Sequence, residues 1–93
     1  MADIKAIGIL ETKGFVPLIE GADAGLKAAN VALLEWRQIG SGFVSFVVEG
    51  EVAAVRSALE AARNAASAVG EVLSEIVIPR PVEELKSTFG ESA

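Results

Sequence analysis

The chain has 93 residues, which is enough for one small domain, and 52% of them are hydrophobic. It contains no cysteine and no histidine, so a disulfide framework, a thiolate nucleophile and an imidazole base or metal ligand are all excluded. The formal net charge of -5 argues against nucleic-acid binding, because phosphate recognition needs a concentrated basic surface.

The apolar content, with a mean hydropathy of +0.47, exceeds what one small core can bury. The surplus needs a membrane or protein partners, and no apolar run approaches the roughly 20 residues that span a bilayer. Oligomerisation is therefore the better interpretation. The apolar run over residues 6–10 is too short for the core of a signal peptide and lacks its basic lead, so we expect a cytoplasmic protein.

The first half of the chain predicts a strand followed by a helix. The near-continuous apolar residues of 5–11 favour a strand that is central in its sheet, and residues 12–14 are expected to turn the chain. A helix is predicted over residues 16–29, with one apolar stripe formed by Leu18, Ala22, Leu26 and Ala29. Gly21 and Gly25 lie beside this stripe, and each lowers helix propensity by about 1 kcal/mol relative to alanine. We therefore expect a close backbone contact at these two glycines.

A β-hairpin is predicted next. From Val31 the apolar period changes to two, which indicates a strand to about Ile39 in which Leu34 and Trp36 share one face. The short Gly40-Ser41-Gly42 connection leads into a second alternating strand over residues 43–49.

The second half repeats the strand and helix pattern. A second helix begins near Glu51 and ends at Gly70, with a predicted buried stripe of Val52, Val55, Leu59, Ala62 and Ala66. A last strand is predicted over residues 72–78, followed by the rigid Pro79-Arg80-Pro81 and a short acidic helix over residues 82–87.

This order predicts an α+β fold of the ferredoxin-like type, with helices packed on one face of an antiparallel sheet. The other face of the sheet must meet solvent or a neighbour. We expect a single domain over residues 1–93, with a core at about 4–81 and a short C-terminal helix and tail at 82–93.

Side chains suited to catalysis are scarce. The nearest carboxylate pairs are Glu49 with Glu51 and Glu83 with Glu84, and both are interpreted as solvated groups or as groups facing a helix dipole. No acidic cluster has the loop spacing of a calcium site, so neither a metal nor another cofactor is expected. The sequence therefore favours a protein that is not an enzyme.

Three features remain as candidate sites. Gly40-Ser41-Gly42 can present backbone N–H groups and a hydroxyl to a small polar group, although in a monomer a plain hairpin turn is much the better interpretation. Asp23 and Lys27 are spaced for a surface ion pair on the exposed side of the first predicted helix. Arg80 lies between two prolines, which restrict the backbone angles of this segment. Such a rigid backbone fits either contact with a partner or simple loop geometry.

Several segments in this order and spacing resemble the bacterial microcompartment shell proteins of the single-domain, hexamer-forming type. They are Ile9-Leu10-Glu11-Thr12-Lys13-Gly14, Ala22-Asp23-Ala24, Lys27-Ala28-Ala29-Asn30-Val31, Ile39-Gly40-Ser41-Gly42, Val69-Gly70-Glu71-Val72 and Ile78-Pro79-Arg80-Pro81. The resemblance covers residues from about 4 to 81.

The resemblance implies a cyclic homohexamer that tiles edge to edge with adjoining hexamers and other shell proteins around encapsulated enzymes. It implies that Ile39, Gly40, Ser41 and Gly42 line a narrow central pore for small polar metabolites. It further implies that the edge between hexamers is formed by Lys27, Asn30 and Arg80, with Asp23 beside them.

Two positions depart from the pattern common in the family. Gln38 stands where many relatives carry a lysine just before the turn, with Arg37 next to it, and Val82 stands where several carry a histidine. The main alternative is a ferredoxin-like regulatory module that binds metabolites between its subunits, and a small acyl-phosphate hydrolase is a third possibility. The hydrolase would need an arginine and an asparagine around a phosphate cradle, and the sequence offers no such loop.

Overall fold

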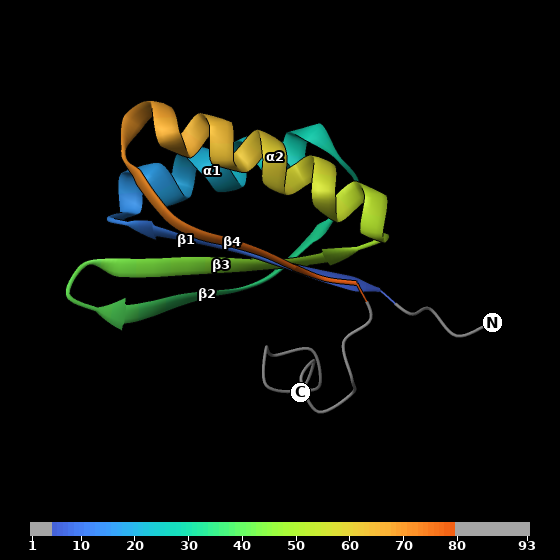
Figure 1. Ribbon diagram of the computed structural model, residues 1–93, viewed down its shortest axis with the longest axis horizontal. Helices are drawn as coiled ribbons and strands as arrows, with labels where there is room; N and C mark the ends of the chain where they lie inside the picture. The colour runs from blue at the N-terminus through green and yellow to red at the C-terminus, as the bar shows by residue number, and fades with distance from the viewer. Residues whose placement is uncertain (1–4, 80–93) are drawn as a thin grey trace.

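The computed structural model describes residues 5–79. Its elements are β1 (Ala6–Lys13), α1 (Phe15–Ala28), β2 (Ala32–Gly40), β3 (Phe43–Gly50), α2 (Val52–Val69) and β4 (Glu71–Ile78). The strands form one antiparallel sheet in the order β2-β3-β1-β4, and both helices lie on the same face of it (Figure 1). The prediction of an α+β, ferredoxin-like fold with helices on one face is therefore confirmed.

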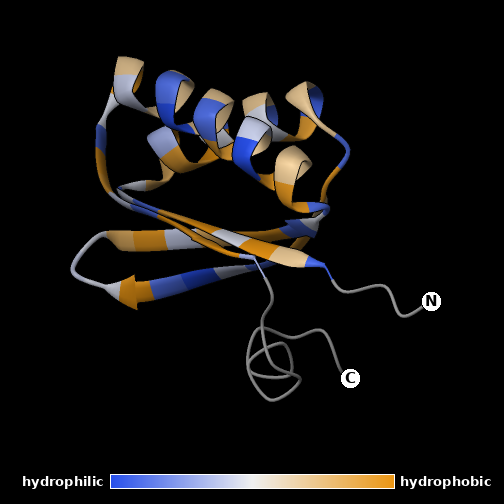
Figure 2. Cartoon of the chain, turned by 45° about the vertical axis from the view of Figure 1, so that its right-hand side comes forward, coloured by the Kyte–Doolittle hydropathy of each residue, from blue (hydrophilic) through white to orange (hydrophobic). Residues whose placement is uncertain are grey.

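The core lies between the helices and the sheet. Alternate residues of β1 and β3 point toward the helices, and Leu10, Phe46 and Leu59 are among the fully buried side chains there. Figure 2 shows hydrophobic residues along the strands and alternating hydrophobic and hydrophilic stretches along the helices. Within residues 5–79, no helix is long and apolar enough to cross a membrane.

The two helices touch through small residues. A Cβ atom added at Gly21 would lie 3.0 Å from the carbonyl oxygen of Ala62, and one added at Gly25 would lie 2.9 Å from that of Ala58. Such distances leave no room for a side chain, since the neighbouring atoms belong to backbone. The expected close backbone contact at these glycines is thus confirmed, and helix α2 is the element that makes it.

The predicted buried stripes were wrong at two positions of the first helix and one of the second. Leu26 and Val52 were expected to be buried and are exposed, and Ala29 is half-buried in extended backbone after the end of α1. The buried face of α1 instead includes Gly21 and Gly25, and that of α2 includes Ala58, because each helix packs against its neighbour as well as against the sheet.

The turn predicted at residues 12–14 was wrong for its first two residues. Thr12 and Lys13 belong to β1, where they pair with Val44 and Phe43. Thr12 is fully buried, and its hydroxyl donates a 3.0 Å hydrogen bond to the Gly14 carbonyl. The chain therefore reverses at Gly14 alone, whose φ of 91° is readily accessible to glycine.

Strand β2 is less regular than its sequence pattern suggests. Leu33 pairs with Val48 and Glu35 pairs with Val47, so Leu34 is an extra residue in a bulge. Trp36 pairs with Phe46 and shares its helix-facing side. The prediction that Leu34 and Trp36 share one face of a regular strand is corrected accordingly, because Leu33 takes the paired position and Leu34 lies in the bulge.

Candidate functional site

The β2–β3 turn is an exposed loop with unusual backbone angles. Gly40, Ser41 and Gly42 have φ values of 113°, 57° and 81°, and Ser41 is the one non-glycine residue with positive φ in the described chain. Glycine tolerates such angles at low cost, whereas a serine held there costs of order 1 to 3 kcal/mol. All residues from 37 to 43 are exposed, so the polar groups of the turn face solvent in the single chain.

The turn is fixed to the start of α1. The Gly14 N–H donates a 2.6 Å hydrogen bond to the Gly42 carbonyl. Lys13 pairs with both Phe43 and Glu71, so its ammonium-bearing side chain belongs to the turn end of the sheet. About 30 residues separate Lys13 from Gly42, and only the strand register brings them together, so no local pattern predicts that Lys13 lies near the turn.

The two residues before the turn point to opposite faces of the sheet. Gln38 pairs with Val44 and faces the helix side, whereas Arg37 pairs with Ser45 and faces the other side. The Arg37 guanidinium donates hydrogen bonds of 2.9 Å and 2.6 Å to Oε2 of Glu35. The carboxylate of Glu35 therefore compensates the charge of Arg37, and Glu35 lies further from the turn along β2 than Arg37 does.

Lys27 and Asp23 lie at the opposite end of α1 from the turn. Lys27 Nζ lies 3.0 Å from Asp23 Oδ2, and both side chains are well exposed. The expected i, i+4 pair is present, and such exposed pairs contribute roughly 0.3 to 0.5 kcal/mol. Because this ion pair contributes little to folding, breaking it costs little, and the Lys27 ammonium group is available for contact with another molecule.

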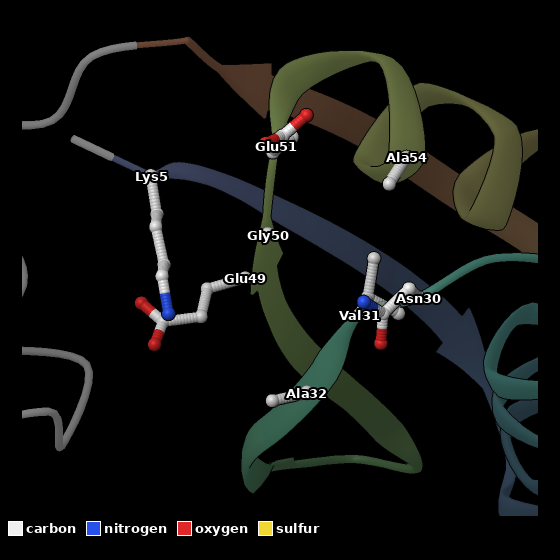
Figure 3. Close-up of a pocket in the computed structure, with 8 residues that line it drawn as sticks. All are labelled: Lys5, Asn30, Val31, Ala32, Glu49, Gly50, Glu51 and Ala54. Carbon is white, nitrogen blue, oxygen red and sulfur yellow. The ribbon is translucent and has the colours of Figure 1, made fainter. Parts of the chain in front are cut away.

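Asn30 follows α1 and lines a pocket of about 470 Å³ (Figure 3). The pocket lies where the α1–β2 and β3–α2 connections meet the start of β1. Its lining residues are Lys5, Asn30, Val31, Ala32, Glu49, Gly50, Glu51 and Ala54. Lys27, Asp23 and Asn30 thus belong to one end of the molecule, and the Gly40-Ser41-Gly42 turn belongs to the other.

Glu49 differs from its expected solvated state. Oε1 of Glu49 is buried and has no hydrogen-bond partner among the described residues. The reason is that β3 extends to Gly50, so Glu49 pairs with Ile7 and Ala32 within the sheet and not in a turn. Residues 5–79 hold no group of three or more side chains arranged to bind a metal ion.

Arg80, the remaining candidate edge residue, lies outside the described residues, as do Val82 and the helix predicted over residues 82–87. Strand β4 ends at Ile78, at the same end of the sheet as the start of β1, because Ile7 pairs with Ile78. The described chain therefore ends near the pocket that contains Asn30.

Residues 6–81 match the family model of the BMC domain. The chain belongs to this family. It is 45% identical over 86 residues to the bacterial microcompartment shell protein EutM of Salmonella typhimurium, which covers 92% of this chain and 90% of EutM. It is 51% identical over 77 residues to the shell protein PduA of Citrobacter freundii, which covers 83% of each chain.

A crystal structure of a microcompartments protein from Desulfitobacterium hafniense DCB superposes with a TM-score of 0.85 and 31% sequence identity. The match covers 98% of this chain and 49% of that one, so the BMC domain described here spans about half of that chain.

EutM and PduA are both bacterial microcompartment shell proteins. The chain is a structural shell protein of a bacterial microcompartment, and its location is the microcompartment shell in the cytoplasm. The alternative of a metabolite-binding regulatory module is not favoured.

Proposed function

We propose that this shell protein forms a cyclic homohexamer whose rings pack edge to edge into the facets of the shell. The proposal is supported most directly by the positions of the two candidate sites, which lie at opposite ends of strand β2. The Gly40-Ser41-Gly42 turn ends β2, whereas Asn30 and Lys27 lie just before its start. One subunit can therefore present the turn to a central axis and its other end to an adjoining ring.

In this arrangement, residues 1–93 act as a single shell domain, and the chain catalyses no reaction. Its partners are adjoining hexamers, other shell proteins and the encapsulated enzymes. Hexamers with a central pore are typical of the family. The high apolar content supports the proposal, because contacts between subunits would bury surface that one small core cannot.

The central pore would be lined by six copies of Ile39, Gly40, Ser41 and Gly42, with Arg37 and Gln38 near its mouth. The turn is exposed and its three residues have positive φ angles, so its backbone groups other than the Gly42 carbonyl, which accepts from the Gly14 N–H, can hydrogen-bond to a small molecule. A ring of hydroxyls and N–H groups replaces part of the hydration shell of a small polar metabolite and offers an apolar one little. The pore would therefore favour polar substrates over apolar, volatile intermediates.

The outer edge of each ring would carry Lys27, Asn30 and Arg80, with Asp23 beside Lys27. In a layer with twofold axes between rings, each Lys27 meets its counterpart across the seam. Its exposure and its weak pairing with Asp23 support this role, since little is lost when the ammonium group turns toward a neighbouring ring.

The oligomeric state tests the ring directly. Native mass spectrometry of the purified protein is expected to show six subunits, and electron microscopy is expected to show flat arrays. A monomer would overturn the proposal. Dimers or trimers that tighten with a metabolite would favour the regulatory module instead.

Replacing Ser41 with leucine is expected to lower metabolite flux through assembled shells severalfold, because six apolar side chains would narrow the constriction and remove its hydroxyls. Flux into shells loaded with a substrate-consuming enzyme would measure the effect. Ser41→Ala provides the matched control, since it removes the hydroxyl without adding bulk. Unchanged flux in intact Ser41→Leu shells would contradict the pore role of this turn.

A further inference from the structure

The row of the sheet next to the turn carries no ionisable group on its helix side. Gln38 of β2 is exposed there and pairs with Val44 of β3, which belongs to the core under the helices. Val44 in turn pairs with Thr12 of β1, and Thr12 pairs with Val72 of β4. On this side, the sheet therefore presents an uncharged surface beside the turn.

On the face of the sheet that neither helix covers, here called the open face, Arg37 is bound by a carboxylate of its own strand (Figure 1). Glu35 and Arg37 are two residues apart on β2, so their side chains lie on the same face. Nε and Nη2 of Arg37 donate hydrogen bonds of 2.9 Å and 2.6 Å to Oε2 of Glu35. The Glu35 side chain is only 20% exposed, so salt screens this pair less than it screens a fully exposed one. The two groups together carry no net charge.

Lys13 also lies opposite a carboxylate. It pairs with Glu71 in the register of β1 and β4, and directly paired residues of antiparallel strands have Cβ atoms about 4.5 to 5.5 Å apart on one face. Glu11 lies two residues before Lys13 on the same face of β1, and its Oε1 accepts a 3.2 Å hydrogen bond from the Ser74 hydroxyl. The positive charge of Lys13 therefore has negative charge on either side of it.

Positive charge is thus not in excess near the turn. In the half of the open face that ends at the turn, the charged residues of the described strands are the cations Lys13 and Arg37 and the carboxylates Glu11, Glu35 and Glu71. A surface with charges of one sign raises the local concentration of ions of the opposite sign, and a balanced surface does not. The net charge of -5 of the whole chain further disfavours the approach of anions.

We propose that the pore admits uncharged polar metabolites in preference to anions of similar size, and that Glu35 sets this preference by neutralising Arg37. This inference rests on the pore proposed above, in which six copies of the turn surround the axis. The solutes that fit are neutral molecules with hydroxyl, carbonyl or amide groups. The hydroxyls and N–H groups of the turn can hydrogen-bond to them, and no surplus of positive charge draws in carboxylates or phosphates.

Two fluorescence quenchers test the proposal, iodide as the anion and acrylamide as the uncharged polar solute. Shells assembled around a fluorescent reporter protein are mixed with each quencher, and the rate at which fluorescence falls measures its entry. After correction for quenching of the free reporter, acrylamide is expected to enter wild-type shells several times faster than iodide. Added salt should not slow the entry of iodide, because there is no positive potential for the salt to screen.

The variant Glu35→Gln removes the carboxylate and so adds positive charge to the balance in every subunit. It should speed the entry of iodide severalfold, make that entry fall as salt is added, and leave acrylamide unchanged. Gln38→Lys adds positive charge on the helix side and should act in the same direction. Glu35→Asp keeps the carboxylate and should behave like the wild type. Glu60→Gln is the matched control, because it makes the same change in net charge at an exposed position in the middle of α2.

The outcomes separate this inference from the pore itself, once native mass spectrometry has shown that each variant forms six-subunit rings. If Ser41→Leu leaves the entry of both quenchers unchanged, the pore is overturned and this inference with it. If Ser41→Leu slows both quenchers, yet Glu35→Gln and Gln38→Lys leave iodide entry at the wild-type rate, the pore stands and the role of charge is overturned. Faster entry of iodide than of acrylamide into wild-type shells, with a rate that falls as salt is added, also overturns the role of charge.

Discussion

Gly25→Leu is expected to lower the free energy of unfolding of the domain by about 1 to 3 kcal/mol or more. A Cβ at this position would already lie 2.9 Å from the Ala58 carbonyl oxygen, which is backbone and cannot move without displacing helix α2. Overpacking of this kind typically costs about 1 to 3 kcal/mol and sometimes more. Replacing a helical glycine returns at most about 1 kcal/mol of propensity, so the steric effect dominates.

Urea unfolding followed by circular dichroism, at matched protein concentration, measures the change in the free energy of unfolding. Ala28→Leu is the control, because it adds a large side chain to an exposed position of the same helix. Its expected effect is within about 0.5 kcal/mol. Wild-type stability in Gly25→Leu would show that the helices do not depend on backbone contact at this glycine.

Lys27→Asp is expected to abolish the packing of rings into sheets while leaving each ring intact. Two aspartates would face each other at every seam, and like charges 4 Å apart repel by about 1 kcal/mol in water and about 4 kcal/mol near a protein surface. The repulsion is repeated at every edge of a ring. The cost to folding is small, since the new carboxylate would face Asp23 on an exposed side of α1, where two like charges four residues apart repel by only about 0.2 to 0.5 kcal/mol.

Electron microscopy would show whether sheets form, and native mass spectrometry would show whether six-subunit rings form. Lys27→Arg keeps the charge and is expected to assemble. Ordinary sheets formed by Lys27→Asp would contradict the assignment of Lys27 to the edge, whereas loss of the rings themselves would show that Lys27 acts within the ring and not between rings.

Much of the fold could be predicted from local sequence signals. Apolar periodicity predicts the approximate positions of the helices, the hairpin and the strands. Their ends are indicated by residues that interrupt regular structure, namely Gly40-Ser41-Gly42, Gly50 and Gly70. The errors have a common cause. Thr12 and Lys13 look like a turn by composition, yet pairing with β3 keeps them in the strand, and Leu26 looks buried by periodicity, yet the contact between the helices turns it outward.

The candidate site was only partly predictable. The turn and the Asp23–Lys27 pair are local in sequence, so their geometry could be anticipated. Three features depend on strand register and on which face a side chain occupies: the placement of Lys13 beside the turn, the burial of Oε1 of Glu49 and the compensation of Arg37 by Glu35. A one-residue bulge reverses that face, and periodicity alone does not locate bulges.

The sequence by itself determined the class of fold, the scarcity of catalytic side chains and the segments that resemble the shell-protein family, because these depend on residue types and their spacing. Only the tertiary structure decided that the turn and the Lys27 end lie at opposite ends of the subunit and that Gly21 and Gly25 lie against helix α2. The physical reason is that these groupings arise from the angle and offset of α1 on the sheet. That placement is set by backbone contact at Gly21 and Gly25, between residues far apart in the chain.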